Sequence, residues 1–191
     1  MFNFFKKKIK VTNREDFQSI IKDLYLNITV IHENHCNLII DLVNQIPAKD
    51  KFGTQTFLGV SLYEAVYGYQ ITCLIGFTSQ QGLISIMDNL ELKKILLNEI
   101  SAQTGFNRES IAEYDEFFLN CRGDINFLSD EFYNKICEIC NIDQNSESHS
   151  KMSNIFKKKS ITLAIETQKG TAKAFGSNYL VQELDKVLKG Y

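Results

Sequence analysis

Two histidines and a cysteine, His32, His35 and Cys36, are the residues of this chain whose types and spacing best suit chemistry. Spacings of three and four residues place them on one side of a helix. Imidazole and thiolate bind zinc and other transition metals, and Cys73 or Cys121 could supply a further ligand. A histidine hydrogen-bonded on a buried helix face, beside a buried thiol, explains the same residues. The sequence is therefore compatible with a metal site and with a structural cluster at these residues.

Glu64 is the only charged residue between Lys51 and Asp88, and it lies in an apolar segment. A carboxylate on an apolar helix needs a partner, and we predict that Glu64 meets His32 or His35. Such a pair would either fix the register of two helices or act as an acid–base dyad. The structural role is favoured because neither a nucleophile nor a Gly-rich phosphate loop accompanies the pair, and a helical-bundle enzyme or metal protein is the alternative.

Cys137 and Cys140 form a C-x-x-C pair at the expected C-terminal end of a helix. The helix dipole there disfavours a thiolate, which is the opposite of what redox chemistry requires. The chain has five cysteines, an odd number, and most lie among apolar neighbours. This pattern predicts buried thiols in a reduced, cytoplasmic protein.

Acidic residues are concentrated between positions 109 and 131, where Arg122 is the only basic residue. A patch of one sign steers association and selects oppositely charged partners, although a solvated helix face also accounts for it. We therefore predict a non-enzymatic protein that binds a basic partner protein, as an inhibitor or immunity-type protein would. The candidate contact residues are Glu109, Glu113, Asp115, Glu116, Asp124, Asp130 and Glu131.

Two lysine-rich runs, 6–10 and 157–159, could contact phosphate or anionic lipid. The formal net charge of −2 gives no overall attraction to nucleic acid. A peripheral membrane or nucleic-acid contact through these lysines is therefore a further alternative. Segment 55–77 is apolar on nearly every side, but its glutamate, glutamine and tyrosines would be costly in hydrocarbon, so we expect no membrane span.

The elements that must position these residues are predicted to be helices. Apolar residues spaced by three and four from Phe17 to Leu42 indicate one long helix over 13–46, which Pro47 ends. The β-branched run 28–31 leaves a break or a strand there open. Further helices are predicted over 55–77, 83–103, 108–121 and 130–140, the last of these capped by Ser129, and after Ser177.

Hydrophobic residues make up 44% of the 191 residues, enough for a substantial core. We predict an all-α multi-helix bundle built around two long antiparallel helices, 13–46 and 55–77, with small residues of the second helix allowing their close approach. The predicted organisation is a basic tail (1–12), a helical core domain (13–140), a flexible loop (141–154) and a C-terminal segment with a terminal helix packed on the core (155–191).

Two features of this organisation are left open by the sequence. Ile161, Leu163 and Ile165 alternate as in a strand, so the segment 155–175 could form a helix or a minor two-stranded element. The oligomeric state is also open, because the apolar seam of the first helix could face a second copy.

Overall fold

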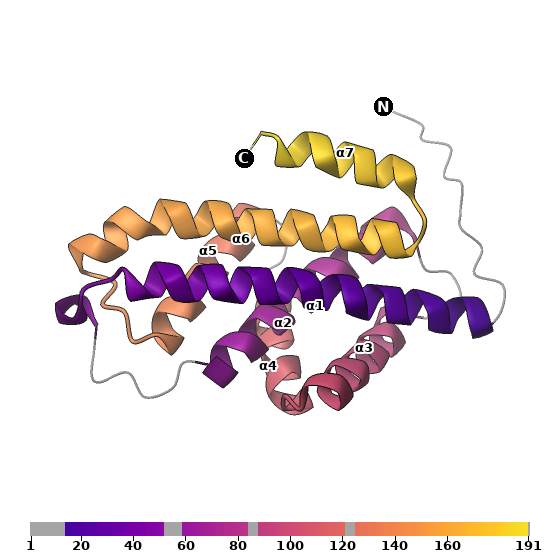
Figure 1. Ribbon diagram of the computed structural model, residues 1–191, viewed down its shortest axis with the longest axis horizontal. Helices are drawn as coiled ribbons and strands as arrows, with labels where there is room; N and C mark the ends of the chain where they lie inside the picture. The colour runs from indigo at the N-terminus through magenta and orange to yellow at the C-terminus, as the bar shows by residue number, and fades with distance from the viewer. Residues whose placement is uncertain (1–13, 52–58, 84–87, 121–124, 191) are drawn as a thin grey trace.

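The computed structural model describes residues 14–51, 59–83, 88–120 and 125–190. These residues form seven α-helices, a short 3-10 helix and no strand, with one isolated antiparallel bridge between Lys51 and Ile142. The predicted all-α multi-helix bundle is confirmed (Figure 1). The elements are α1 (Arg14–Asn44), η1 (Ala48–Asp50), α2 (Gly59–Gln81), α3 (Asn89–Thr104), α4 (Arg108–Leu119), α5 (Ile125–Ile139), α6 (Glu147–Ala174) and α7 (Asn178–Leu188).

The two longest helices, α1 and α6, lie side by side and run antiparallel (Figure 1). His35 of α1 contacts Glu166 of α6. Asn27, earlier on α1, contacts Gly170, later on α6, so the two helices run in opposite directions. A Cβ atom at position 170 would lie 3.1 Å from Asn27 Cβ, so glycine permits this close approach. Helix α6 is therefore a long antiparallel partner of α1 that the sequence did not indicate.

Helix α1 continues without a break through the β-branched run at 28–31. Ile28 is 2% exposed, and its burial outweighs the few tenths of a kcal/mol by which β-branched residues disfavour helix. The helix ends at Asn44, and Pro47 precedes η1. Asn13, the predicted start of this helix, lies outside the described residues.

Helix α2 occupies the centre of the bundle and contacts α1, α3, α4, α5 and α6. The part of the chain that the structure describes contains no helix long and apolar enough to span a membrane. The small-residue face of α2 meets α4, not α1 as predicted: Gly68 lies against the main chain of Tyr114 and Asp115. Thr72 strengthens this contact by donating its hydroxyl to Asp115 Oδ1 at 2.9 Å.

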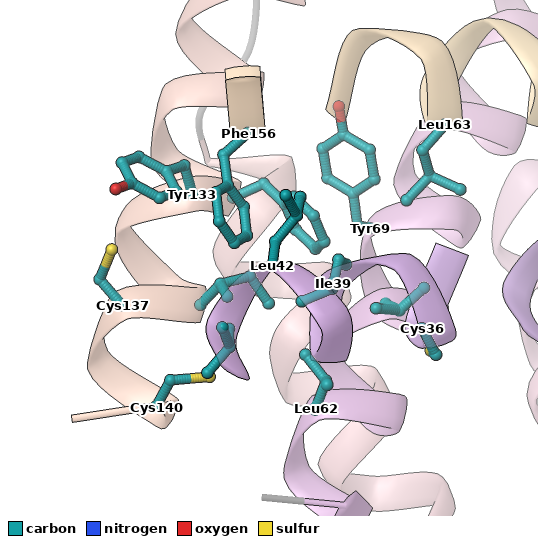
Figure 2. Packing of buried hydrophobic residues seen from close by; sticks show 14 of the residues in the cluster. Cys36, Ile39, Leu42, Leu62, Tyr69, Tyr133, Cys137, Cys140, Phe156 and Leu163 are labelled. Atoms are coloured by element: carbon teal, nitrogen blue, oxygen red, sulfur yellow. The ribbon is translucent and has the colours of Figure 1, made fainter. Parts of the chain in front are cut away.

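The core has two main clusters along α1, and Figure 2 shows the one around its C-terminal half. Tyr69 of α2 lies at its centre, with its ring centroid 4.3 Å from that of Phe132. Its hydroxyl points toward α6 and donates to the Ser160 carbonyl at 3.0 Å. The same hydroxyl lies 3.2 Å from Ser129 Oγ, so one side chain links α2, α5 and α6.

Helix α6 begins at Glu147, so the predicted loop 141–154 is wrong over residues 147–154. Ser146 Oγ accepts a hydrogen bond from the His149 backbone N–H at 3.1 Å, and this N-cap starts the helix within a polar segment. Segment 155–174 is helical as well. Its strand-like alternation arises because α6 contacts α1, α2, α5 and α7, which bury side chains on several of its faces.

Two other helices begin at different residues from those predicted. Helix α3 begins at Asn89, because Asp88 Oδ1 accepts from the Glu91 N–H at 2.7 Å and caps it. Helix α5 begins at Ile125, and Ser129, the predicted cap, is fully buried inside it. The terminal helix α7 packs against α6 and has no fully buried residue.

Candidate functional site

His32 is held in a buried structural arrangement between α1 and α2. Its ring stacks on Tyr67 with centroids 3.6 Å apart, and its Nε2–H donates to the Tyr63 carbonyl at 2.9 Å. Cys36 Sγ lies 3.6 Å from the same ring nitrogen. His32 and Cys36 are therefore brought together as the helical spacing predicts.

The protonation states of this pair do not suit nucleophilic catalysis. Burial lowers the pKa of His32 to about 4, although its bond to the Tyr63 carbonyl acts in the opposite direction. Burial also raises the pKa of the Cys36 thiol. Both groups are consequently neutral at pH 7, whereas an activated cysteine needs a thiolate beside an imidazolium.

His35 lies on the α6 side of α1, apart from this pair. Its Nδ1–H donates to the Ile31 carbonyl at 3.0 Å, and its Nε2 lies 3.5 Å from Glu166 Oε2. Within the described ranges, no three His, Cys, Asp or Glu side chains are arranged to hold a metal ion. Cys121, one of the suggested further ligands, lies outside those ranges. The geometry thus gives the zinc alternative at His32, His35 and Cys36 no support.

Glu64 meets neither histidine, so the predicted pairing is wrong. It is 5% exposed, and its Oε1 accepts a hydrogen bond from the Asn107 backbone N–H at 3.1 Å. Asn107 is the N-cap of α4, and its side chain accepts from the N–H of Glu109 at 2.8 Å. Glu64 therefore anchors the turn before α4 to the central helix, which is a positioning role.

The C-x-x-C pair is buried in the core at the end of α5 (Figure 2). Burial raises the pKa of Cys137 to about 11 and that of Cys140 to about 12. Thiols with pKa values this high are poor nucleophiles in redox exchange. Cys36, Cys73, Cys137 and Cys140 are all unpaired and buried.

The buried His32 ring predicts that acidification destabilises the protein. Its pKa is about 4 when folded and about 6.5 when unfolded, so below pH 6.5 the unfolded chain binds the extra proton. We expect this histidine to lower the free energy of unfolding by about 3 kcal/mol as the pH falls from 6.5 to 4. NMR titration of the His32 ring should show no protonation above pH 5.

A comparison of urea unfolding for the natural chain and His32→Phe isolates this contribution from that of the carboxylates, which both proteins share. The phenylalanine ring can still stack on Tyr67, but it does not titrate. The variant should therefore lose less stability than the natural chain between pH 6.5 and 4. A His32 resonance that titrates near pH 6.5 would contradict the assignment.

Helix α4 carries three of the predicted partner-binding residues on its outer side. Glu109, Glu113 and Glu116 are exposed, whereas Ile111 and Phe118 on the opposite side are buried. Spacings of four and three residues keep the carboxylates within one narrow arc. We call this set, together with the adjacent Phe117, the acidic α4 face.

Asp115, a predicted contact residue, is 1% exposed and belongs to the core contact between helices. It forms a salt bridge with Lys93 of α3 and accepts a hydrogen bond from Thr72 of α2. A buried carboxylate requires such partners because desolvation is costly. Asp115 therefore joins α2, α3 and α4 and is removed from the candidate binding surface.

The other predicted acidic residues are divided between different surroundings. Asp130 forms a salt bridge of 2.9 Å with Lys157 of α6. Glu131 is partly exposed, and its Oε1 accepts a hydrogen bond from Asn134 Nδ2 at 3.4 Å. Asp124 lies outside the described residues. Glu131 lies one helical turn before Lys135, whose ammonium contacts the Phe117 ring on α4.

Phe117 also belongs to the candidate surface, although it is not among the contact residues predicted from the sequence. It is 37% exposed, and the Lys135 ammonium lies 5.0 Å from its ring centroid. Its position four residues after Glu113 was the available signal, because that spacing places the two side chains one above the other. An exposed aromatic ring beside carboxylates is a common element of protein interfaces.

The two lysine runs differ in how much of them is described. Lys158 and Lys159 of α6 are exposed, while Lys157 is engaged with Asp130. Residues 6–10 lie outside the described part of the chain.

Comparisons of this chain with protein-family models, with curated proteins and with solved structures found no match.

Proposed function

We propose that this protein is a non-enzymatic binding protein whose acidic α4 face docks onto a basic surface of another protein. The observation that carries the proposal is the placement of Glu109, Glu113 and Glu116 on successive turns of α4, all exposed. Carboxylates in this arrangement steer and orient a basic partner. Phe117 adds exposed apolar area of the kind that becomes buried in the centre of interfaces.

The spacing of these carboxylates supports a role beyond solubility. Like charges three or four residues apart destabilise a helix by about 0.2–0.5 kcal/mol per pair, and Glu113 forms such a pair with both Glu109 and Glu116. Arg108 Nε lies 3.6 Å from Glu109 Oε1 and offsets part of this repulsion. Glu113 and Glu116 have no salt-bridge partner within the described residues, so a basic partner would relieve their repulsion.

Binding is also favoured over catalysis by the state of the other candidate groups. The lowered pKa of His32 and the raised pKa of the Cys36 thiol, both caused by burial, leave that pair neutral and inert. We infer an inhibitor or immunity-type role, in which α4 covers a basic region of its target. A cytoplasmic location is part of the same proposal, and the four buried, unpaired thiols support it.

Charge reversal on α4 is expected to weaken binding strongly. The triple variant Glu109→Lys, Glu113→Lys, Glu116→Lys should capture its partner from a lysate of the source cell at least tenfold less well than the natural chain. The reason is that three attractive contacts become repulsive, and charged rims act mainly on association. Binding of the captured and purified partner to the natural chain should weaken as salt is raised from about 50 to 300 mM, because screening shortens the range of the attraction.

A matched triple reversal on α1 provides the control. Asp23, Glu33 and Asp41 are exposed on that helix, and Asp23→Lys, Glu33→Lys, Asp41→Lys changes the net charge by the same amount. The α1 triple should retain binding within about threefold. Equal loss in both triples would mean that net charge, not the acidic α4 face, governs association.

The single change Glu113→Gln separates binding from folding. It removes two repulsive pairs, so stability should stay the same or rise by up to about 0.5 kcal/mol while partner affinity falls. A Glu113→Gln protein that binds its partner as tightly as the natural chain would contradict a central role for this carboxylate.

A further inference from the structure

A groove of about 710 Å³ opens between the C-terminal half of α2, the start of α3, and parts of α4, α5 and α6. Phe77, Phe118 and Leu128 contribute to its apolar lining, and the first two are buried. Gln80, Asn89 and Gln168 contribute side-chain amides. Among the described residues that line it, none carries a charge. Grooves of this size and lining between helices of a bundle are typical of small-molecule sites.

Gly76 gives this groove a feature that packing does not explain. Glycine inside a helix destabilises it by about 1 kcal/mol relative to alanine. At Gly68 and Gly170 that loss has a structural reason, because a Cβ atom would press against α4 or α1. Gly76 is exposed and lines the groove, and no atom of the other described elements lies within 4 Å of where its Cβ would be. A Cβ atom here would therefore lie at the edge of the groove without a close contact to the described residues.

We propose that this groove binds an uncharged, mainly apolar small molecule, and that Gly76 keeps the space for it. The apolar lining would cover the body of the ligand. The amides of Gln80, Asn89 and Gln168 can both donate and accept hydrogen bonds, so they suit a hydroxyl, carbonyl or amide group on the ligand. A charged ligand is disfavoured because no described lining residue would compensate its desolvation.

The groove and the acidic α4 face have no residue in common. The two sites share helix α4: Phe118, which lines the groove, is buried, and Leu119, which also lines it, lies three residues after the exposed Glu116. The positions changed in the test of the groove, Gly76 and Ser79, belong to α2, so their substitution should leave partner binding at the acidic α4 face unaffected.

The test uses the full chain and Nile red, an uncharged dye that fluoresces in apolar sites. We expect saturable binding that 1-decanol displaces, with decanoate at least tenfold less effective because of its charge. Gly76→Leu should weaken Nile red binding at least tenfold by filling the groove. Ala102→Leu, which adds the same side chain on the exposed side of α3, should bind the dye as the natural chain does.

Folding of the variant is checked by urea unfolding, and Gly76→Leu should be at least as stable as the natural chain because leucine favours helix over glycine. If Gly76→Leu is unfolded, Nile red binding is measured with Ser79→Phe instead, because Ser79 also lines the groove and is exposed. Absence of saturable dye binding, or equal binding by the groove-filling and control variants, would overturn the proposal. Displacement by decanoate as effective as by 1-decanol would overturn the assignment of an uncharged ligand.

Discussion

Replacing Gly68 with alanine is expected to lower the free energy of unfolding by about 2 kcal/mol, as overpacking of a tight core contact does. A Cβ atom at this position would lie 2.5 Å from Tyr114 Cβ and 2.8 Å from the Asp115 backbone nitrogen. Neither atom can move by a side-chain rotation, so α2 and α4 would have to separate. Urea unfolding of Gly68→Ala measures the loss.

The same helix supplies the control for this prediction. At Gly76 no atom of the other described elements lies within 4 Å of the new Cβ, so Gly76→Ala should raise stability by up to about 1 kcal/mol through its helix propensity. The two glycine-to-alanine changes on α2 should therefore have opposite signs. An unchanged or increased stability of Gly68→Ala would mean that α4 does not lie against α2 as described.

Lys93→Met is expected to destabilise the protein by about 3 kcal/mol, the lower end of the range for removing one partner of a buried ion pair. The Asp115 side chain is 2% exposed and Lys93 is 20% exposed, so the change leaves a buried carboxylate without its countercharge. Thr72 still donates to Asp115 Oδ1 at 2.9 Å, but a single hydroxyl does not offset the desolvation of a charge. Denaturant unfolding at pH 7 gives the value.

Lys94→Met, at the next residue of α3, is the matched control. Lys94 is exposed, and no salt bridge involves it within the described residues, so its loss should change stability by no more than about 0.5 kcal/mol. Adding Asp115→Asn to Lys93→Met should recover part of the stability, because no unpaired charge remains buried. Similar effects at positions 93 and 94 would show that the Asp115 ion pair contributes little.

Periodicity in the sequence was sufficient to predict the helical class and the outer face of α4. Apolar residues at three- and four-residue spacing predicted α1, and the structure confirms that this helix continues through Ile28 to Ile31. The same rule placed Glu109, Glu113 and Glu116 together, opposite Ile111 and Phe118. The same spacing places Asp115 on the buried side, because it lies four residues after Ile111 and three before Phe118.

Contacts between helices could not be derived from local patterns. The small residues of α2 correctly indicated a close helix approach, but nothing in the spacing specifies that Gly68 faces α4 and not α1. Glu64 was recognised as a buried carboxylate, yet its partner is a backbone N–H of Asn107, a group that every non-proline residue carries. The pairing of Lys93 with Asp115 likewise depends on the arrangement of three helices.

Helix α6 is buried on several sides, so a prediction that assumes a single apolar face does not identify it as a helix. Ile161, Leu163 and Ile165 are all 3% exposed or less, although helical geometry points them in different directions. Their alternation resembles a half-buried strand only when one buried face is assumed. The polar start of α6 resembles a loop in the sequence, because Ser146 caps the helix and serine-rich composition alone does not distinguish a cap from a loop.

The most direct test of the account is carboxylate footprinting of the protein alone and with its captured partner. A water-soluble carbodiimide and glycine ethyl ester label exposed carboxylates, and mass spectrometry reads the labelling at each site. The account predicts that the partner reduces labelling of Glu109, Glu113 and Glu116 severalfold, while Asp23, Glu33 and Asp41 of α1 are labelled as before. Unchanged labelling of the three α4 glutamates in a saturated complex would contradict the claim that this face binds the partner.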